Sequence, residues 1–400
     1  MPLRYPPSCL YTDMVSFLNP AVSDRVTRTY QTLSRDKLIE WVTSGSLCTA
    51  AADCERHCCS GVKCIARRAI VHVAGTPCVD WSAQWAKRLR ECGPSMLATL
   101  VWLAQRLLVA EPLLVHENVK GFDVGLLVAA LGNSYIIFSH VSNFADLGFA
   151  VTRVRRLTIC VRKYLYLKVT FSWSDFVNSC RRVTRYSWHD FLRASPEEIE
   201  ESVRWAENRK ESMARLDLDA LRVAIAEECD GHTDADVDRV LAVALETRHT
   251  RSLIPSECRR LLKCRDMCMA KRGTLEHLVC YVGQEPGAHN QMSFAEVMLT
   301  IVRSGSICWA DGNVRRALTA KELLSCQGFI SYPSLATGPM TSDFLRPRLR
   351  NRRQLLLQAG NSMPVPLVGL ALMYSIIAVE RRPLIQLSSG MSTVLSLKRK

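Results

Sequence analysis

The stretch Ala69-Ile-Val-His-Val-Ala74-Gly75-Thr-Pro-Cys78 decides the fold class of this 400-residue chain. Its first six residues are mostly apolar, which predicts a short buried strand, and the strand runs into a glycine and a Pro-Cys step. A second strand is predicted at Leu113-Leu-Val115, which runs into His116-Glu117-Asn118-Val119. Two further strands are predicted at 134–141 and 157–161. Strands that alternate with helical segments favour an α/β fold with parallel strands.

The two first strands end in residues that carry chemistry. Open α/β sheets bind ligands beyond the carboxyl ends of their strands. Cys78 and Glu117 both follow such ends, so they can converge on one crevice although 39 residues separate them. A Pro-Cys step alone is weak evidence, because a buried inert thiol is the usual state of a cysteine and this chain has 17.

Composition indicates the class of partner and the compartment. Lys and Arg number 52 against 38 Asp and Glu, a net charge of +14, which suits a polyanion such as nucleic acid. The first twenty residues contain no apolar core of signal-peptide length, so the many cysteines indicate thiols in a reducing intracellular compartment, the nucleus in a eukaryote. The apolar run 363–379 contains Pro364 and Pro366 and is shorter than the ~20 residues of a membrane span, so it predicts a buried core helix and no membrane partner.

The middle of the chain changes character and predicts an inserted, partly helical module. Ser195-Pro-Glu-Glu198 is a capping box with proline at the first helical position. A second helix is predicted from about Thr233, with apolar residues at helical spacing: Val237, Val240, Leu241, Ala244 and Leu245. The predicted domains are a first part at 1–165, the module at 166–310, a return to the first domain at 311–385 and a tail at 386–400.

Further motifs follow Glu117 in a definite order. They are Leu147-Gly148-Phe-Ala-Val-Thr-Arg153-Val-Arg155, Arg316-Ala-Leu-Thr319-Ala-Lys-Glu322, Cys326-Gln327-Gly328-Phe329 and Gly360-Asn361-Ser362. Together with the Pro-Cys and Glu-Asn-Val steps, this order resembles the DNA (cytosine-5-)-methyltransferase family, in a divergent version like those of some protist genomes.

The resemblance implies a Rossmann-like, S-adenosylmethionine-dependent methyltransferase fold whose inserted module recognises the target. The implied activity is methyl transfer to C5 of a flipped cytosine in DNA through a covalent adduct on Cys78. By resemblance, Cys78 is the nucleophile, Glu117 contacts N3 and the exocyclic amine, and Arg155 contacts the base. Asn361 and Ser362 would close the cofactor pocket.

Other interpretations of these residues stay open. Arg155 could contact a phosphate or form a surface ion pair, and Asn361 could cap a turn. Asp13, in Cys9-Leu-Tyr-Thr-Asp13, resembles the family's contact to the adenine amine but could lie in a simple turn. Arg316 and Glu322 resemble a block that supports the recognition module.

Several features depart from the family's pattern. The Phe-x-Gly-x-Gly loop that holds the cofactor is not visible before Gly75, and Val151 stands where the arginine block has glutamine. Two other functions therefore remain: a non-catalytic remnant that binds nucleic acid, and an RNA cytosine C5 methyltransferase.

The remaining clusters are less specific. The segment from Cys48 to Cys64 favours thiols over zinc, because its spacing does not form paired Cys-x-x-Cys knuckles, and no metal site is predicted. Phosphate contacts are expected at a dense arginine run: Arg346, Arg348, Arg350, Arg352 and Arg353. A second basic group lies beside aromatic residues: Arg181, Arg182, Arg185, Tyr186 and Trp188. The sequence predicts neither the DNA context nor the oligomeric state.

Overall fold

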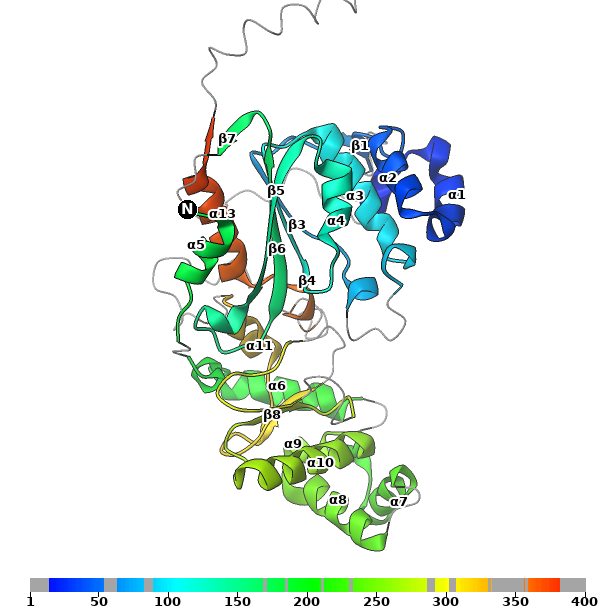
Figure 1. Cartoon of the computed structure of the whole chain (residues 1–400). Helices are drawn as coiled ribbons and strands as arrows, with labels where there is room; N and C mark the ends of the chain where they lie inside the picture. Colours follow the sequence, from blue (N-terminus) through cyan, green and yellow to red (C-terminus); the bar gives the residue numbers. More distant parts are fainter. Residues whose placement is uncertain are drawn as a thin grey trace, which may run out of the picture. The chain divides into compact units, whose positions relative to one another are not determined.

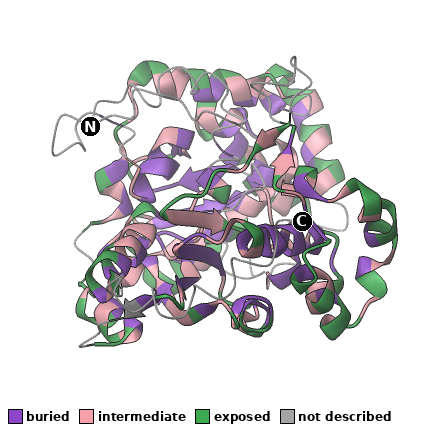
Figure 2. Ribbon diagram, turned by 90° about the horizontal axis from the view of Figure 1, so that it is seen from above, coloured by how far each residue is buried: buried purple, intermediate pink, exposed green. Residues whose placement is uncertain are grey.

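The computed structural model describes most of the chain and divides it into two compact units (Figure 1). The described residues are 14–53, 63–82, 89–167, 171–183, 186–209, 212–229, 233–285, 292–301, 307–329, 332, 356 and 359–381. The first unit, here called the sheet unit, holds Pro2–Ser142, Val154–Cys180 and Leu367–Lys400. The second, here called the module unit, holds Met1, Asn143–Arg153 and Arg181–Pro366. Figure 2 shows where the buried residues lie along the ribbon.

The sheet unit is built on a four-stranded sheet in the order β3-β4-β6-β5. Its strands are β3 (Val71–Gly75), β4 (Leu113–Val119), β5 (Tyr135–Asn143) and β6 (Val154–Arg162). β3 pairs with β4 in parallel, whereas β6 pairs with β4 antiparallel. The predicted α/β fold class is confirmed as a mixed sheet with helices. The expectation of parallel strands is correct for β3 and β4 and wrong for β4 and β6.

Burial along the strands follows their place in the sheet. The central strand β4 is buried from Leu113 to Asn118, as an apolar strand covered on both faces requires. The edge strand β3 is only half-buried, and Ile70 just before it is 73% exposed. The prediction of a buried strand at 69–74 was therefore wrong in its burial, because an edge strand has a neighbour on one side only.

Helix α3 (Met96–Val109) supplies much of the sheet unit's apolar core. All but one of its residues from Met96 to Arg106 are buried, and the helix ends at Ala110, whose backbone is left-handed with φ 61°. Helix α4 (Val124–Leu131) begins at Asp123, whose carboxylate accepts a hydrogen bond from the Gly125 N–H. This cap satisfies one of the helix's otherwise unpaired N–H groups.

Smaller elements complete the sheet unit. Before β3 lie η1 (Met14–Phe17), α1 (Pro20–Thr29), η2 (Tyr30–Thr32), α2 (Arg35–Thr43) and the two-stranded ribbon β1 (Ala51–Ala52) and β2 (Cys64–Ile65). After β3 come η4 (Val79–Trp81) and η5 (Arg90–Cys92). After β6 come β7 (Leu165–Leu167) and α5 (Trp173–Ser179). The C-terminal part of the unit contains α13 (Val365–Ala378) and β12 (Val379–Arg381), which pairs with β7.

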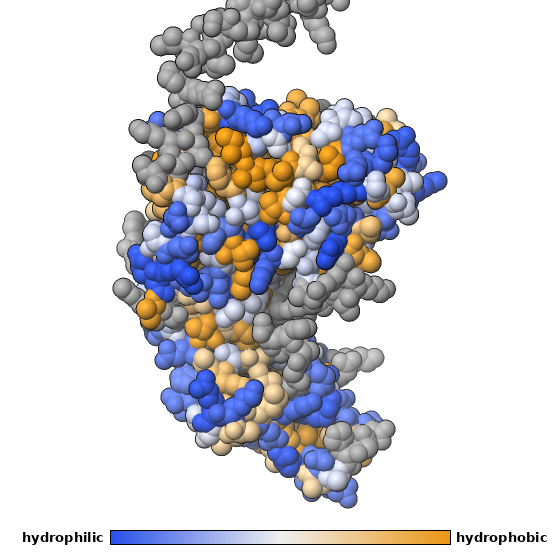
Figure 3. All heavy atoms as spheres, viewed as in Figure 1, coloured by the Kyte–Doolittle hydropathy of each residue, from blue (hydrophilic) through white to orange (hydrophobic). Residues whose placement is uncertain are grey.

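The apolar run predicted as a buried core helix forms α13, and the prediction holds for one of its faces. Tyr374 is buried and packs against the rings of Trp173 and Phe176. The opposite face is open, with Ile376 76% exposed and Ile377 55% exposed. The helical segment Ala359–Ala378 is long and apolar enough to cross a membrane, but one such helix is weak evidence because core helices pass the same test. On the face drawn in Figure 3, apolar side chains also gather over β5.

The module unit combines helices with a small antiparallel sheet in the order β11-β10-β8-β9. Its strands are β8 (Leu278–Tyr281), β9 (Met292–Phe294), β10 (Cys308–Ala310) and β11 (Arg316–Ala317). Its helices are α6 (Pro196–Glu207), α7 (Leu218–Glu228), α8 (Asp234–Glu246), α9 (Arg248–Arg251), α10 (Pro255–Arg272) and α11 (Ala320–Cys326). Short 3-10 turns are η6 (Phe144–Asp146), η7 (Trp188–Phe191) and η8 (Met213–Arg215).

The two predicted helix starts of the module are confirmed. Ser195 caps α6 through a capping box with Glu198, and Thr233 caps α8 in the same way with Asp236. Of the apolar residues predicted on one face of α8, Val237, Val240 and Ala244 are buried and Leu241 is partly buried. Leu245 was wrongly included. It is 51% exposed, and Val243 turns toward the core in its place.

Candidate active site

Cys78 lies on the loop that leaves the carboxyl end of β3. It is half-buried and directly precedes η4. The next turn is fixed by Asp80, which is fully buried and accepts hydrogen bonds from the Ser95 N–H at 2.9 Å and the Ser95 hydroxyl at 2.5 Å. A β-carbon at Gly93 would overlap the Asp80 carboxyl group, so this turn requires glycine at that position. These contacts therefore fix the backbone that follows Cys78.

Glu117 and Arg155 form an ion pair across the two central strands. Glu117 lies on β4, and Arg155 lies on β6 opposite Val119, so their side chains share one face of the sheet. The Arg155 Nε lies 2.9 Å from the Glu117 Oε1, and the two side chains are 13% and 9% exposed. An ion pair this buried needs good geometry to offset its desolvation, which restricts the orientation of the carboxylate.

The sheet register brings the Cys78 loop next to Glu117. In the parallel pair of β3 and β4, Gly75 lies opposite Glu117, and Cys78 follows Gly75 by three residues. Both residues thus lie at the carboxyl edge of adjacent parallel strands, where ligands bind in such sheets. All three predicted catalytic residues lie in the sheet unit, where Glu117 is paired with Arg155 and Cys78 follows the end of the neighbouring strand β3.

The structure describes two of the three predicted cofactor residues, Asn361 and Ser362. Asn361 and Ser362 belong to the module unit, where Asn361 is exposed and the Ser362 hydroxyl donates to the Ala359 carbonyl at 3.0 Å. Asp13 lies outside the described residues. None of the chain's 19 glycines lies two residues from another, so the chain contains no Gly-x-Gly step.

Arg153 has a clear structural role that the sequence did not predict. It is 2% exposed, and its guanidinium donates to three backbone carbonyls, those of Ile301 at 2.9 Å, Gly360 at 3.1 Å and Ser362 at 2.7 Å. Within the module unit, it therefore clamps the turn that carries Asn361. The only signal in the sequence was its place in the arginine block.

Arg316 and Glu322 form a second buried ion pair in the module unit. The two guanidinium nitrogens of Arg316 lie 2.9 Å and 2.7 Å from the Glu322 carboxylate, and Glu322 is fully buried. The same carboxylate accepts the N–H of Thr319 at 2.8 Å and that of Ala194 at 3.3 Å. The pair thus ties α11 to the chain that leads into α6.

The sequence predicted no role for three residues in and beside the Cys78 loop. They are Thr76, His116 and Asn118, all buried and joined by hydrogen bonds of 2.8–3.1 Å. Burial lowers the pKa of His116 to about 3. His116 and Asn118 were visible only as parts of the quoted motif.

The other predicted clusters are described in part. Cys48 is buried and Cys64 is half-buried, while Cys54, His57, Cys58 and Cys59 lie outside the described residues. Where the chain is described, no three His, Cys, Asp or Glu side chains gather as a metal site. Arg181 pairs with Asp146 at 3.1 Å, whereas Arg185 and the arginine run 346–353 also lie outside the described residues.

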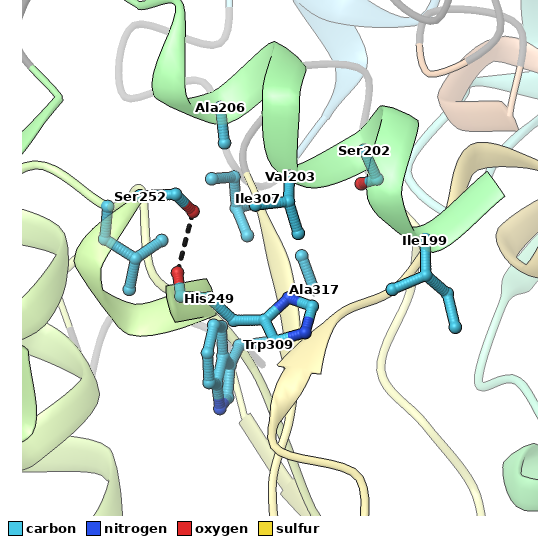
Figure 4. A pocket seen from close by; sticks show the side chains of 10 residues that line it. Ile199, Ser202, Val203, Ala206, His249, Ser252, Ile307, Trp309 and Ala317 are labelled. Atoms are coloured by element: carbon cyan, nitrogen blue, oxygen red, sulfur yellow. Dashed lines mark hydrogen bonds between the residues drawn. The ribbon is translucent and has the colours of Figure 1, made fainter. Parts of the chain in front are cut away.

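A small cavity in the module unit is not a ligand site. It lies between α6, α9 and the strands β10 and β11, and its volume of about 10 Å³ is about that of one water molecule (Figure 4). It is lined by Ile199, Ser202, Val203, Ala206, His249, Ser252, Leu253, Ile307, Trp309 and Ala317. The Ser252 hydroxyl donates to the His249 carbonyl at 2.7 Å, and burial lowers the pKa of His249.

Comparisons with known proteins give structural likenesses only. No protein-family model matches the chain, and no curated protein matches it. Dnmt2 methyltransferase of S. pombe is 13% identical with a TM-score of 0.40, over 87% of this chain and 83% of that one. A putative DNA modification methyltransferase of an E. coli prophage is 15% identical with a TM-score of 0.39, over 77% and 79%. Spodoptera frugiperda DNMT2 is 14% identical with a TM-score of 0.35, over 90% of each chain. Likenesses this distant carry no argument about function.

Proposed function

We propose that this chain transfers a methyl group from S-adenosylmethionine to C5 of a cytosine in DNA, through a covalent adduct on Cys78. The observation that carries the proposal is the parallel pairing of β3 and β4, with Gly75 opposite Glu117. It supports a shared site for a thiol and a carboxylate that lie far apart in sequence. The ordered motifs from Cys78 to Ser362 support the same reaction.

The chain's own residues account for the activation of the base. Cytosine C5 is a weak nucleophile, and addition of the Cys78 thiolate to C6 forms a sulfur–carbon bond that moves electron density to C5. Glu117 stabilises this adduct when its carboxyl group, having taken up a proton from water, donates that proton or a hydrogen bond to N3. Arg155 holds the Glu117 carboxylate in orientation through the 2.9 Å ion pair.

Completion of the reaction restores the aromatic base. After C5 has gained the methyl group, a base takes the C5 proton, and the electron pair of that bond expels the Cys78 thiolate from C6. S-adenosylmethionine supplies the methyl group when it is bound. The target cytosine must leave its stack, because attack on C6 requires access to the face of the ring.

The proposed partner is DNA, with RNA as the alternative polyanion. The net charge of +14 favours either one. An intracellular location, nuclear in a eukaryote, belongs to the same proposal because the substrate is there.

A second candidate function is a non-catalytic remnant that binds nucleic acid. This candidate requires no Gly-x-Gly step, which lets the backbone approach a nucleotide cofactor closely, and the 400 residues contain none. The remnant would keep the pairing of Glu117 with Arg155 and the basic surface but would not bind S-adenosylmethionine.

The test is a covalent trap with the full-length protein. Duplex DNA with 5-fluorocytosine is incubated with and without S-adenosylmethionine, and denaturing electrophoresis measures the adduct, since fluorine at C5 blocks elimination. The adduct should form with S-adenosylmethionine and be lost in Cys78→Ala. Cys92→Ala is the matched control, because Cys92 is exposed and lies on the nearby η5.

The outcomes separate the candidates. An adduct with DNA supports the proposal, and an adduct only with 5-fluorocytosine RNA assigns the same chemistry to RNA. If the folded wild-type protein binds DNA in a salt-dependent way but forms no adduct with either nucleic acid, the remnant is correct and the methyltransferase proposal is overturned.

A further inference from the structure

We propose that His116 is a positioning residue that holds the Cys78 loop in place through the hydroxyl group of Thr76. The consequence for catalysis rests on the proposed function, whereas the consequence for the loop does not. The sequence Thr-Pro-Cys places Thr76 two residues before Cys78. A side chain that fixes Thr76 therefore restricts the backbone that presents the thiol.

The Thr76 hydroxyl is the centre of a small buried network. Its oxygen lies 2.8 Å from the His116 Nε2 and accepts a hydrogen bond from the Asn118 Nδ2 at 2.9 Å. The Asn118 amide also donates to the Thr76 carbonyl at 3.1 Å. Both β4 residues that flank Glu117 thus grip the same residue of the Cys78 loop.

The hydrogen bonds to Thr76 come from side chains on the face of the sheet opposite to Glu117. Side chains alternate along a strand, so His116 and Asn118 point to one face of β4 and Glu117 points to the other. Glu117 shares its face with Arg155. The network can therefore hold the loop without occupying the face on which the carboxylate would meet a base.

Aromatic packing keeps the His116 ring in place. It stacks on Trp102 with ring centroids 5.0 Å apart and contacts Phe122 at 4.9 Å. Phe122 in turn packs against Trp81 at 5.1 Å, and Trp81 follows Cys78 by three residues. His116 is thereby connected to the chain on both sides of Cys78.

The hydrogen-bond directions follow from the donor inventory. The Asn118 Nδ2 can only donate, so the Thr76 oxygen accepts from it and has its own proton available to donate. In the proposed arrangement this proton is donated to the unprotonated Nε2 of His116, whose neutral imidazole then carries its proton on Nδ1. The low pKa of the buried ring, about 3, agrees with a neutral imidazole. His116 therefore acts as an acceptor and not as an acid.

Two pairs of variants test this role. Thr76→Val removes the hydroxyl at nearly constant shape, and Thr76→Ser restores it. His116→Phe keeps an aromatic ring without an acceptor, and His116→Gln supplies an oxygen at a similar reach. The first readout is the rate at which iodoacetamide alkylates Cys78 in the full chain, measured by mass spectrometry against the exposed Cys92. Thermal unfolding confirms that each variant is folded.

The expected result is faster alkylation of Cys78 in Thr76→Val and His116→Phe, roughly five-fold, as the loss of one buried hydrogen bond predicts. Thr76→Ser and His116→Gln should return the rate toward the wild type. The second readout is adduct formation with 5-fluorocytosine DNA, in which the same two variants should lower the maximal rate and leave the DNA concentration at half-maximal rate unchanged.

The two readouts separate this inference from the proposed function. If each folded variant alkylates at the wild-type rate, the positioning role is overturned. If the variants change alkylation as expected but the wild type forms no adduct with any nucleic acid, the loop assignment stands and the methyltransferase proposal fails.

Discussion

The two units use their buried polar groups in different ways. In the sheet unit, Glu117, His116 and Asn118 gather beside one loop at the carboxyl edge of β3 and β4. In the module unit, buried ion pairs join one element to another: Arg316 of β11 pairs with Glu322 of α11, and Arg265 of α10 pairs at 2.5 Å with Asp311, which follows β10. Polar groups that converge on one loop fix the position of that loop, whereas ion pairs between elements hold those elements together.

The distribution of charge sharpens the contrast. Residues 196–285 of the module unit contain 14 Lys and Arg against 19 Asp and Glu, which gives 14 − 19 = −5. The whole chain carries +14. The rest of the chain therefore carries 14 + 5 = +19. Residues 196–285 do not supply the positive charge that would attract a polyanion. If the predicted module at 166–310 recognises DNA, the basic residues that contact the DNA lie in 166–195 or 286–310.

The largest effect on activity is expected for Glu117→Gln. The amide keeps the shape of the side chain but cannot transfer a proton or pair with Arg155, so adduct formation should fall by on the order of 10²–10⁴-fold. The measurement is the rate of the 5-fluorocytosine trap. Glu40→Gln is the control, because Glu40 pairs only with Lys37 on the exposed face of α2. If Glu117→Gln formed the adduct at the wild-type rate, Glu117 would have no role in the proposed chemistry of the sheet unit.

The largest effect on stability is expected in the other unit, for Arg316→Met. It leaves the Glu322 carboxylate buried without its cation, which costs about 3–5 kcal/mol. Urea unfolding followed by fluorescence gives the change in the free energy of unfolding. Arg222→Met is the matched control, because its pair with Asp238 is more than half exposed and should contribute less than about 1 kcal/mol. Equal losses of unfolding free energy in Arg316→Met and Arg222→Met would contradict the stabilising role of the buried pair.

The sheet unit should lose stability in acid. His116 has a pKa of about 3 through burial, and His72 has a pKa of about 3 through burial and the nearby Arg106. Both pKa values lie below the ordinary 6.5, so the stabilisation is complete above pH 6.5 and decreases as the pH falls toward 3. Each histidine should cost roughly 2 kcal/mol by pH 5.

This acid sensitivity is measured by urea unfolding at pH 8, 6.5 and 5. His116→Gln removes one of the two groups, so its loss between pH 6.5 and pH 5 should be smaller than that of the wild type. An unchanged pH dependence would mean that His116 is not held neutral in the folded chain.

The smallest expected effects concern nucleic-acid binding. Lys120 is exposed directly after β4, so Lys120→Gln should reduce the slope of log K against log salt by about 1. Arg239→Gln in the module should leave the slope unchanged, because Arg239 already pairs with Asp266 at 2.7 Å. Filter binding at several salt concentrations measures both. A larger change for Arg239→Gln would move the nucleic-acid surface onto the module helices.

Local patterns predicted much of each unit. The capping boxes at Ser195 and Thr233 identified two helix starts, because a cap depends on residues a few positions apart. Burial was harder to predict, as Ile70 and Leu245 show, because it depends on what lies beside the element. The roles of the predicted site residues stay predictions, and Asp13 lies outside the described residues.

The sequence by itself determined the α/β class, the candidates Cys78, Glu117 and Arg155, and the order of the motifs. Those follow from residue types and short spacings. Only the tertiary structure decided that β6 runs antiparallel to β4, that Arg155 pairs with Glu117, and that His116 holds Thr76. Strand direction and register join residues that lie tens of positions apart, and a one-residue shift in register would reverse every face.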